Sequence, residues 1–203
     1  MAGATTDIEI QSAAAILLGK KPFATIDAAD EFAVSLQTFY DQMVPAILSS
    51  PEWNFSTKYV QLSESATEDP DFAEWETAYA LPGDFLAFKR LYPEVPHQRF
   101  NDYIYTSTSG ELKLEYVYST PVTKWTDPFK QYITYALAAA LSASNAESGQ
   151  LARYFEEKAN YWKIQAMWLD AQGSTSRGIQ RRPWVDARRI GAYRRAAPTT
   201  NGY

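Results

Sequence analysis

Hydrophobic residues recur at helical spacing between residues 128 and 141. Seven apolar residues fall three or four positions apart, which predicts an amphipathic helix with one continuous apolar face. Asp127 is the expected N-cap, and Pro128 suits the first helical position because the N–H that it lacks would have no partner there. The residues of this face are Phe129, Tyr132, Ile133, Ala136, Leu137, Ala140 and Leu141.

A second, longer helix is predicted over 144–172. Ser144 and Glu147 have the spacing of a capping box, and Gly173 is the expected stop. The apolar face of this helix is so wide that another helix or another subunit must cover part of it. It consists of Leu151, Tyr154, Phe155, Ala159, Trp162, Ala166 and Leu169, and it is widened by Tyr161, Ile164 and Trp168.

Two further helices are predicted near the start of the chain. The first covers 8–18 and ends before a Gly-Lys-Lys-Pro segment. The second follows a turn at 25–27 and carries apolar residues on one face from Phe32 to Ile47. Pro45 is expected to kink this helix or to end it early, because proline removes a helical hydrogen bond.

The hydrophobic period changes to two between residues 53 and 118. Apolar and polar residues alternate over 75–81, which predicts a half-buried strand, and a weaker strand is predicted over 55–62. Between them and the next strands, Asp84 is expected to cap a short helical turn that runs to Leu91.

A β-hairpin is predicted around Ser107–Gly110. Strands are predicted over 103–106 and 112–118 on either side of this turn-forming segment. One face of the second strand is expected to be buried, and it consists of Leu112, Leu114, Tyr116 and Tyr118.

The order of these elements predicts the fold class. Helices at both ends of the chain enclose one group of strands, so we expect an α+β fold that is mainly helical. In this prediction a helix bundle carries a small antiparallel β-sheet inserted at about 53–118. Residues 1–173 form the body, and residues 174–203 form an extended C-terminal arm.

Composition excludes several classes of protein. The 203 residues are 46% hydrophobic, which is typical of a folded chain. A mean hydropathy of −0.37 and the lack of long apolar runs argue against a membrane protein. The chain contains no cysteine, so disulfides and thiolate chemistry are excluded. We also find no signal-peptide pattern and expect synthesis in the cytosol.

Residues that would indicate catalysis or cofactor binding are scarce. His97 is the one histidine, and a lone histidine in a loop is most often a surface residue. The glycines do not fall at the spacing of a nucleotide-binding loop, and no Gly-x-Ser-x-Gly motif is present. We therefore expect a protein that is not an enzyme, with no catalytic, cofactor or metal site. Carboxylate pairs contributed by distant segments stay open as a hydrolase alternative.

Charge is divided sharply between the body and the arm. Residues 174–203 contain seven arginines, no lysine and one acid, for a net charge of +6. Residues 1–173 contain 12 basic and 23 acidic side chains, for a net charge of −11. The arginines are Arg177, Arg181, Arg182, Arg188, Arg189, Arg194 and Arg195, interspersed with Trp184, Ile190 and Tyr193.

Three interpretations of the arm remain open. It is a solubilising end, a direct nucleic-acid-binding segment, or a docking arm that orders on a protein partner. Arginine without lysine favours bidentate pairing with carboxylates, and the interspersed Trp184, Ile190 and Tyr193 suit an interface.

The chain resembles the head-to-tail adaptor proteins of short-tailed phages, also called tail tubular or gatekeeper proteins. The resemblance rests on Ala15–Pro22, Pro51–Phe55, Trp75–Leu86, Tyr135–Leu141 and the helical pattern of Leu151–Trp168. It covers about residues 8–172. Its most specific part is the Tyr-Ala-Leu-Pro sequence that begins at Tyr79 and is followed by Asp84 and Leu86.

The resemblance implies a homo-oligomeric ring, expected to be a dodecamer, in the bacteriophage virion. Such a ring is assembled in the host cytoplasm, joins the portal protein of the capsid to the tail nozzle protein, and completes DNA packaging. It surrounds the channel through which the genome DNA leaves during ejection, without binding it specifically. It has no catalysis, no cofactor and no membrane partner.

In this family the C-terminal arm embraces the portal. The expected portal-docking residues are therefore the arginines of residues 174–203 together with Trp184, Ile190 and Tyr193. The expected subunit-packing residues are Tyr154, Tyr161, Trp162 and Trp168. The alternatives are a nucleic-acid-binding module that uses the arm and a virion-associated hydrolase.

Overall fold

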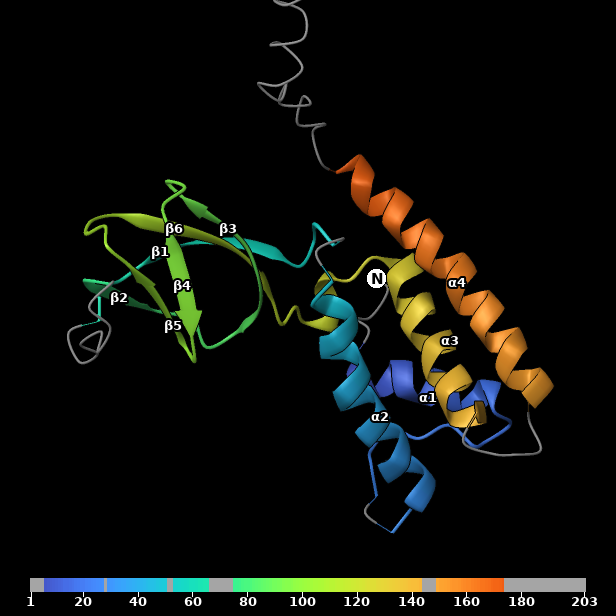
Figure 1. Cartoon of the computed structure of the whole chain (residues 1–203). Coiled ribbons are helices and arrows are strands. Elements are labelled where there is room, and N and C mark those ends of the chain that lie inside the picture. Colours follow the sequence, from blue (N-terminus) through green and yellow to red (C-terminus); the bar gives the residue numbers. More distant parts are fainter. Residues whose placement is uncertain (1–5, 28, 51–52, 66–74, 144–148, 174–203) are drawn as a thin grey trace, which may run out of the picture. The chain divides into compact units, whose positions relative to one another are not determined.

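The computed structural model describes residues 6–27, 29–50, 53–65, 75–143 and 149–173. Within these residues the chain forms four α-helices, a short 3-10 helix and six β-strands (Figure 1). Residues 1–173 belong to one compact unit.

The first two helices begin at side-chain caps. Helix α1 (Asp7–Leu17) starts with a capping box, in which Thr6 N–H donates to Glu9 Oε2 (2.9 Å) and Thr6 Oγ1 accepts from Glu9 N–H. Helix α2 (Glu31–Leu48) is capped by Asp30, whose carboxylate accepts from two backbone N–H groups. These caps satisfy donors that the helices leave without intrahelical partners.

Helices α3 (Asp127–Ala143) and α4 (Gly149–Gln172) lie side by side (Figure 1). Four residues of the apolar face predicted for α3 are buried in the main core with residues of α1 and α2: Phe129, Ile133, Leu137 and Leu141. This core also contains two tryptophans from the linkers next to the strands, Trp53 and Trp125, which pack on either side of Phe129. Aromatic pairs in edge-to-face contact supply much of the buried area.

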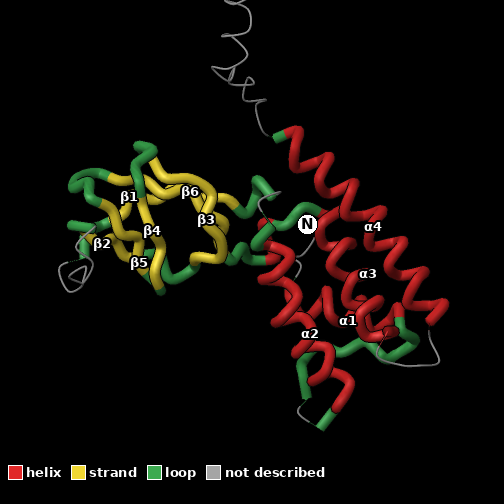
Figure 2. Tube along the Cα trace, in the orientation of Figure 1, coloured by secondary structure: helices red, strands yellow, loops and turns green. Residues whose placement is uncertain are grey.

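The six strands form two antiparallel sheets of three strands each (Figure 2). The first has the order β1-β6-β3 and the second the order β2-β5-β4. The strands are β1 (Thr57–Leu62), β2 (Thr77–Ala80), β3 (Phe85–Tyr92), β4 (His97–Phe100), β5 (Tyr103–Thr106) and β6 (Leu112–Tyr118). Side chains from both sheets share a second core, which includes Leu62, Tyr79, Leu91, Ile104 and Leu114.

The prediction of a helix bundle with one small inserted sheet is wrong. About 48% of the described residues are helical and 23% are in strands, so the fold is roughly α+β with two three-stranded sheets around their own core. The strands predicted from the sequence lie in the right region, but β3 and β4 were not predicted. Short strands such as β4 carry too few residues to show a period of two.

The predicted hairpin at 107–110 does not form. Strand β5 pairs with β2 and β4, whereas β6 pairs with β1 and β3, so the chain passes from one sheet to the other at this segment. The buried Tyr79 hydroxyl holds the crossing by accepting from Gly110 N–H (3.1 Å) and contacting Gly110 O (2.9 Å). Gly110 has φ +126°, a conformation that favours glycine.

Several local predictions also need correction. Residues 85–92 form strand β3 instead of a helical turn capped by Asp84, and His97 lies in strand β4 instead of a loop. Helix α2 continues past Pro45 to Leu48, whose side chain is fully buried and favours the last turn. Helix α3 begins at Asp127, so the N-cap position falls on Thr126.

Candidate functional site

The predicted portal-docking residues lie outside the described part of the chain. These are Arg177, Arg181, Arg182, Trp184, Arg188, Arg189, Ile190, Tyr193, Arg194 and Arg195. The predicted start of the last helix at Ser144 lies outside it as well. The four predicted subunit-packing residues are all described, and all belong to α4.

Three of these four side chains form an exposed aromatic row on α4. Tyr154 is 49% exposed, Tyr161 is 54% exposed and Trp168 is 64% exposed. Their spacing of seven residues places them at nearly the same angle around the helix. Leu151, Ile164 and Leu169 are also exposed and lie on the two flanks of this row. We call these six residues the α4 face.

The fourth residue, Trp162, borders the α4 face without belonging to it. Its side chain is half-buried, and its ring lies 5.3 Å from that of Tyr161. Trp162 therefore lies between the exposed row and the side of α4 that packs on α3. On that packed side, Phe155 is 3% exposed and contacts Ala138 and Ala139 of α3.

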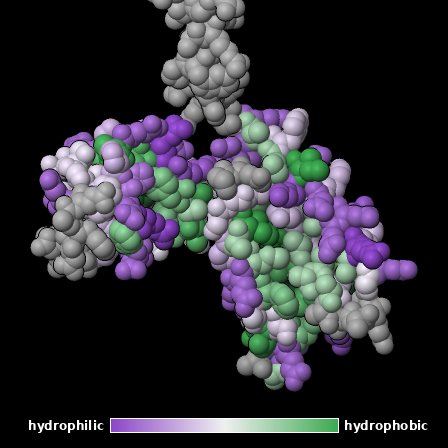
Figure 3. Space-filling view, viewed as in Figure 1, coloured by the Kyte–Doolittle hydropathy of each residue, from purple (hydrophilic) through white to green (hydrophobic). Residues whose placement is uncertain are grey.

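The α4 face contains most of the large hydrophobic side chains that are exposed in the described residues. Six of the nine large hydrophobic side chains that are exposed in the described residues belong to it. On the side of the molecule drawn in Figure 3, hydrophobic surface gathers over the region of α1, α2 and α3, whereas the region of α4 is mostly hydrophilic. Large exposed apolar surfaces of folded proteins commonly mark interaction sites. The wide apolar pattern of 151–169 was the sequence signal for this surface.

The last turn of α4 is tied to the linker that precedes β1. Asp170 is 7% exposed, and its carboxylate accepts hydrogen bonds from Asn54 N–H (2.6 Å) and Phe55 N–H (3.0 Å). A buried carboxylate requires such donors, because water is not available to solvate it. The sequence pattern did not indicate this contact, since its partners are more than a hundred residues apart.

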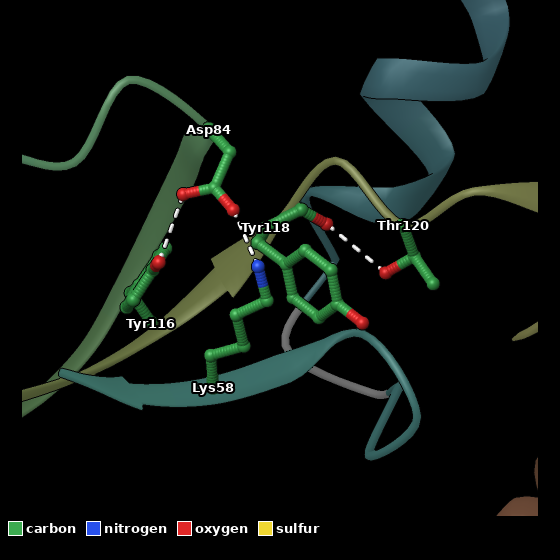
Figure 4. A network of polar contacts seen from close by, with 5 residues as sticks. All are labelled: Lys58, Asp84, Tyr116, Tyr118 and Thr120. Atoms are coloured by element: carbon green, nitrogen blue, oxygen red, sulfur yellow. Dashed lines mark hydrogen bonds and ion pairs between the residues drawn. The ribbon is translucent and has the colours of Figure 1, made fainter.

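A second polar network surrounds Asp84 at one end of the first sheet (Figure 4). Lys58 Nζ lies 2.6 Å from Asp84 Oδ2, and the Tyr116 hydroxyl donates to Asp84 Oδ1 (2.8 Å). The Lys58 ammonium also lies 3.7 Å from the centre of the Tyr118 ring, a cation–π contact. The network joins β1, β6 and the turn before β3.

The contacts of Asp84 shift two pKa values. The hydrogen bond from Lys58 is the largest effect and lowers the pKa of Asp84; burial opposes this shift, and the bond from Tyr116 lowers the pKa further. Burial, followed by the hydrogen bond to Asp84, raises the pKa of Tyr116 to about 12. The Asp84 carboxyl group is therefore charged and the Tyr116 phenol is neutral near neutral pH. We assign the network a structural role.

The described residues contain no group of three or more His, Asp or Glu side chains that could hold a metal ion. The exposed His97 ring lies 5.0 Å from the Phe88 ring, and its Nδ1 is 2.8 Å from Val95 O. None of the helices that the structure describes is long and apolar enough to cross a membrane.

No protein-family profile matches the chain, and a search of curated proteins found no relative.

Proposed function

We propose that the protein is a structural connector of a phage virion, which forms a ring between the capsid portal and the tail. The α4 face is the observation that carries the proposal. A folded subunit with a row of exposed tyrosine and tryptophan has a surface ready for another subunit. The resemblance to head-to-tail adaptors supports the same function.

The composition of the α4 face suits a subunit interface. Tyrosine and tryptophan are enriched among the residues that dominate binding energy, and α4 presents Tyr154, Tyr161 and Trp168 along about 21 Å of helix. A ring requires a head-to-tail interface, in which this face meets a different surface of the next subunit. The same interface repeated around an axis closes the ring.

The charge division supports the position of the ring around DNA. A body of residues 1–173 with a net charge of −11 repels phosphate, so passing DNA is not held by the channel. The arm of residues 174–203, with a net charge of +6, suits an acidic surface on the portal. The arm thus fastens the subunit while the body leaves the genome free to move.

Replacing the aromatic row tests the ring interface. We expect the triple variant Tyr154→Ser, Tyr161→Ser and Trp168→Ser to stay folded but to lose ring assembly on purified portal, as measured by cross-linking and mass determination. The matched control replaces three exposed polar residues of the same helix: Arg153→Ser, Glu156→Ser and Asn160→Ser. Ring assembly by the triple variant at the level of this control would contradict the proposal.

Removing the arm tests the docking role of residues 174–203. We expect the protein shortened to 1–173 to remain a folded, soluble unit and to be lost from pull-downs with portal rings. Normal portal binding by the shortened protein would refute docking through the arm.

The arginines also favour a second candidate function, which is direct binding of nucleic acid by the arm. Counterion release would then make affinity for duplex DNA fall steeply with salt. A peptide of residues 174–203 with duplex DNA at two ionic strengths separates the two candidates. Tight, strongly salt-dependent binding of DNA together with no binding of portal supports the second.

A further inference from the structure

A cavity of about 360 Å³ lies between α1, α2 and the linker from β6 to α3. Its inner wall is apolar and consists of Val44 and Leu48 of α2 together with Trp125 of the linker, all of them buried side chains. The volume is at the small end of the range for ligand-binding pockets. It is suited to one long side chain rather than to a large organic ligand.

The linker wall of this cavity is fixed by hydrogen bonds. The Trp125 indole N–H donates to Thr120 O (2.9 Å), and the Thr120 hydroxyl donates to Tyr118 O (3.2 Å). Both side chains are buried. The indole is therefore held in one orientation, as a preformed binding surface requires.

The rim of the cavity carries two carboxylates, Asp7 of α1 and Asp41 of α2. The Tyr40 hydroxyl donates to Asp7 Oδ1 (2.5 Å), and the Gln37 side-chain amide donates to Asp41 Oδ1 (2.7 Å). Burial, followed by the bond to Asp7, raises the pKa of Tyr40 far above its usual value. Tyr40 therefore stays a neutral donor and orients the side chain of Asp7.

No basic side chain opposes these carboxylates within the described surroundings of the cavity. None of its lining residues is a lysine or an arginine. Helices α1 and α2 contain neither residue type over their whole lengths, although they carry several acids. The electrostatic potential at the rim is therefore negative, and it favours the entry of a cation.

We propose that this cavity binds an arginine side chain presented by a segment of a partner protein. The guanidinium would pair with the carboxylates of Asp7 and Asp41 at the rim. Its methylene groups would pack on Val44 and Leu48, and its planar face suits the indole of Trp125. Charge complementarity and the apolar depth of the cavity together select arginine over a small inorganic cation. The proposal does not depend on the connector function.

Calorimetric titration with a short peptide tests the proposal. The probe is a blocked pentapeptide with arginine at its centre and leucine on both sides, and its control carries neutral citrulline in place of arginine. The full chain and the compact unit 1–173 are both titrated, because residues 174–203 carry arginines that would compete. We expect the arginine peptide to bind about tenfold more tightly than the citrulline peptide.

Two charge-neutralising variants of α2 locate the binding. Asp41→Asn removes a rim carboxylate and should weaken binding of the arginine peptide about fivefold. Glu31→Gln makes the same change of charge on the same helix outside the cavity and should leave binding nearly unchanged. Circular dichroism confirms that both variants are folded.

Three results would overturn the proposal. The first is no binding of the arginine peptide by either form of the protein. The second is equal binding of the arginine and citrulline peptides. The third is an equal loss of affinity in Asp41→Asn and Glu31→Gln, because general negative charge would then account for the binding without the cavity.

Discussion

At the residue scale, two carboxylates join segments that are distant in the sequence. Asp170 connects the last turn of α4 to the linker at Asn54 and Phe55, and Asp84 connects β1 to β6. Both act through hydrogen bonds from donors that the sequence does not place nearby. Their different burial leads to different predictions.

Replacement of Asp170 by asparagine should destabilise the body. The N–H groups of Asn54 and Phe55 bond to different oxygens of the Asp170 carboxylate, and asparagine has an NH2 group in place of one of these oxygens, so one N–H loses a charge-assisted bond. We expect the free energy of unfolding to fall by about 2 kcal/mol in urea denaturation. The exposed Glu156 of the same helix provides a matched control, and Glu156→Gln should change the free energy of unfolding by less than about 0.5 kcal/mol. A loss no larger than in this control would contradict the role of Asp170.

Asp84 should make stability depend on acid pH. The pKa of Asp84 in the folded protein lies below its ordinary value, so the unfolded chain binds more protons than the folded chain as the solution is acidified. The stabilisation that Asp84 contributes is fully present above its ordinary pKa and is lost as pH falls through its pKa in the folded protein. In Asp84→Asn, we expect a shallower loss of stability between about pH 5 and pH 2 than in the parent protein.

Urea midpoints measured across this pH range test the prediction. Because the Asp84 side chain is 37% exposed, solvent screens the pair with Lys58 and the effect should be small. The control is Glu76→Gln, because the Glu76 carboxylate forms no such ion pair within the described residues. Identical pH profiles for Asp84→Asn and the parent would contradict the assignment.

At the scale of elements, α4 has two faces with different roles. One face packs on α3 through Phe155, whereas the α4 face remains exposed. A helix of this kind is stable in the isolated subunit through its packed side alone. Its exposed side is then available for association.

Two adjacent residues of α4 allow the faces to be compared directly. Phe155→Ala creates a cavity between α3 and α4 and should lower the free energy of unfolding by about 3 kcal/mol. Tyr154→Ala removes a half-exposed ring and should lower it by no more than about 1 kcal/mol. Urea denaturation of the two variants measures both values. Similar losses would mean that Tyr154 is packed within the subunit.

The helices could be predicted from sequence, because their signals are local. The apolar period of residues 128–141 and the cap of α1 lie within a few turns of the helices that they specify. The alternation of Leu112, Leu114, Tyr116 and Tyr118 likewise identified the buried side of β6. The α4 face followed from the width of the pattern at 151–169.

The pairing of strands could not be predicted in the same way. The Ser107–Gly110 segment indicates a turn, but nothing within it specifies whether the next strand returns to the same sheet. The Tyr79 hydroxyl, which fixes the crossing at Gly110, comes from a strand thirty residues earlier. Aspartate commonly caps helices, so Asp84 indicated a helical turn. In the structure its carboxylate instead bonds to Lys58 and Tyr116 of neighbouring strands, and these contacts favour a strand after it.

At the scale of the whole molecule, the charge of the sequence is divided between body and arm. The body of residues 1–173 carries −11 and the arm of residues 174–203 carries +6. In the proposed ring, the body faces DNA without holding it, and the arm binds the portal. This division leads to a prediction about each part.

The isolated body should not bind duplex DNA. Fluorescence anisotropy of a labelled duplex with the protein shortened to 1–173 should show no saturable binding, even at about 50 mM salt, where electrostatic binding is strong. A basic protein of similar size serves as the positive control. Saturable binding that weakens with salt would place a nucleic-acid site on the body.

Negative-stain imaging of the protein with purified portal tests the connector function most directly. We expect the full chain to form an additional ring layer on one end of the portal, with an open central channel. We expect neither the chain shortened to 1–173 nor the triple variant at Tyr154, Tyr161 and Trp168 to form this layer. Portal rings that look the same with and without the full chain would contradict the account.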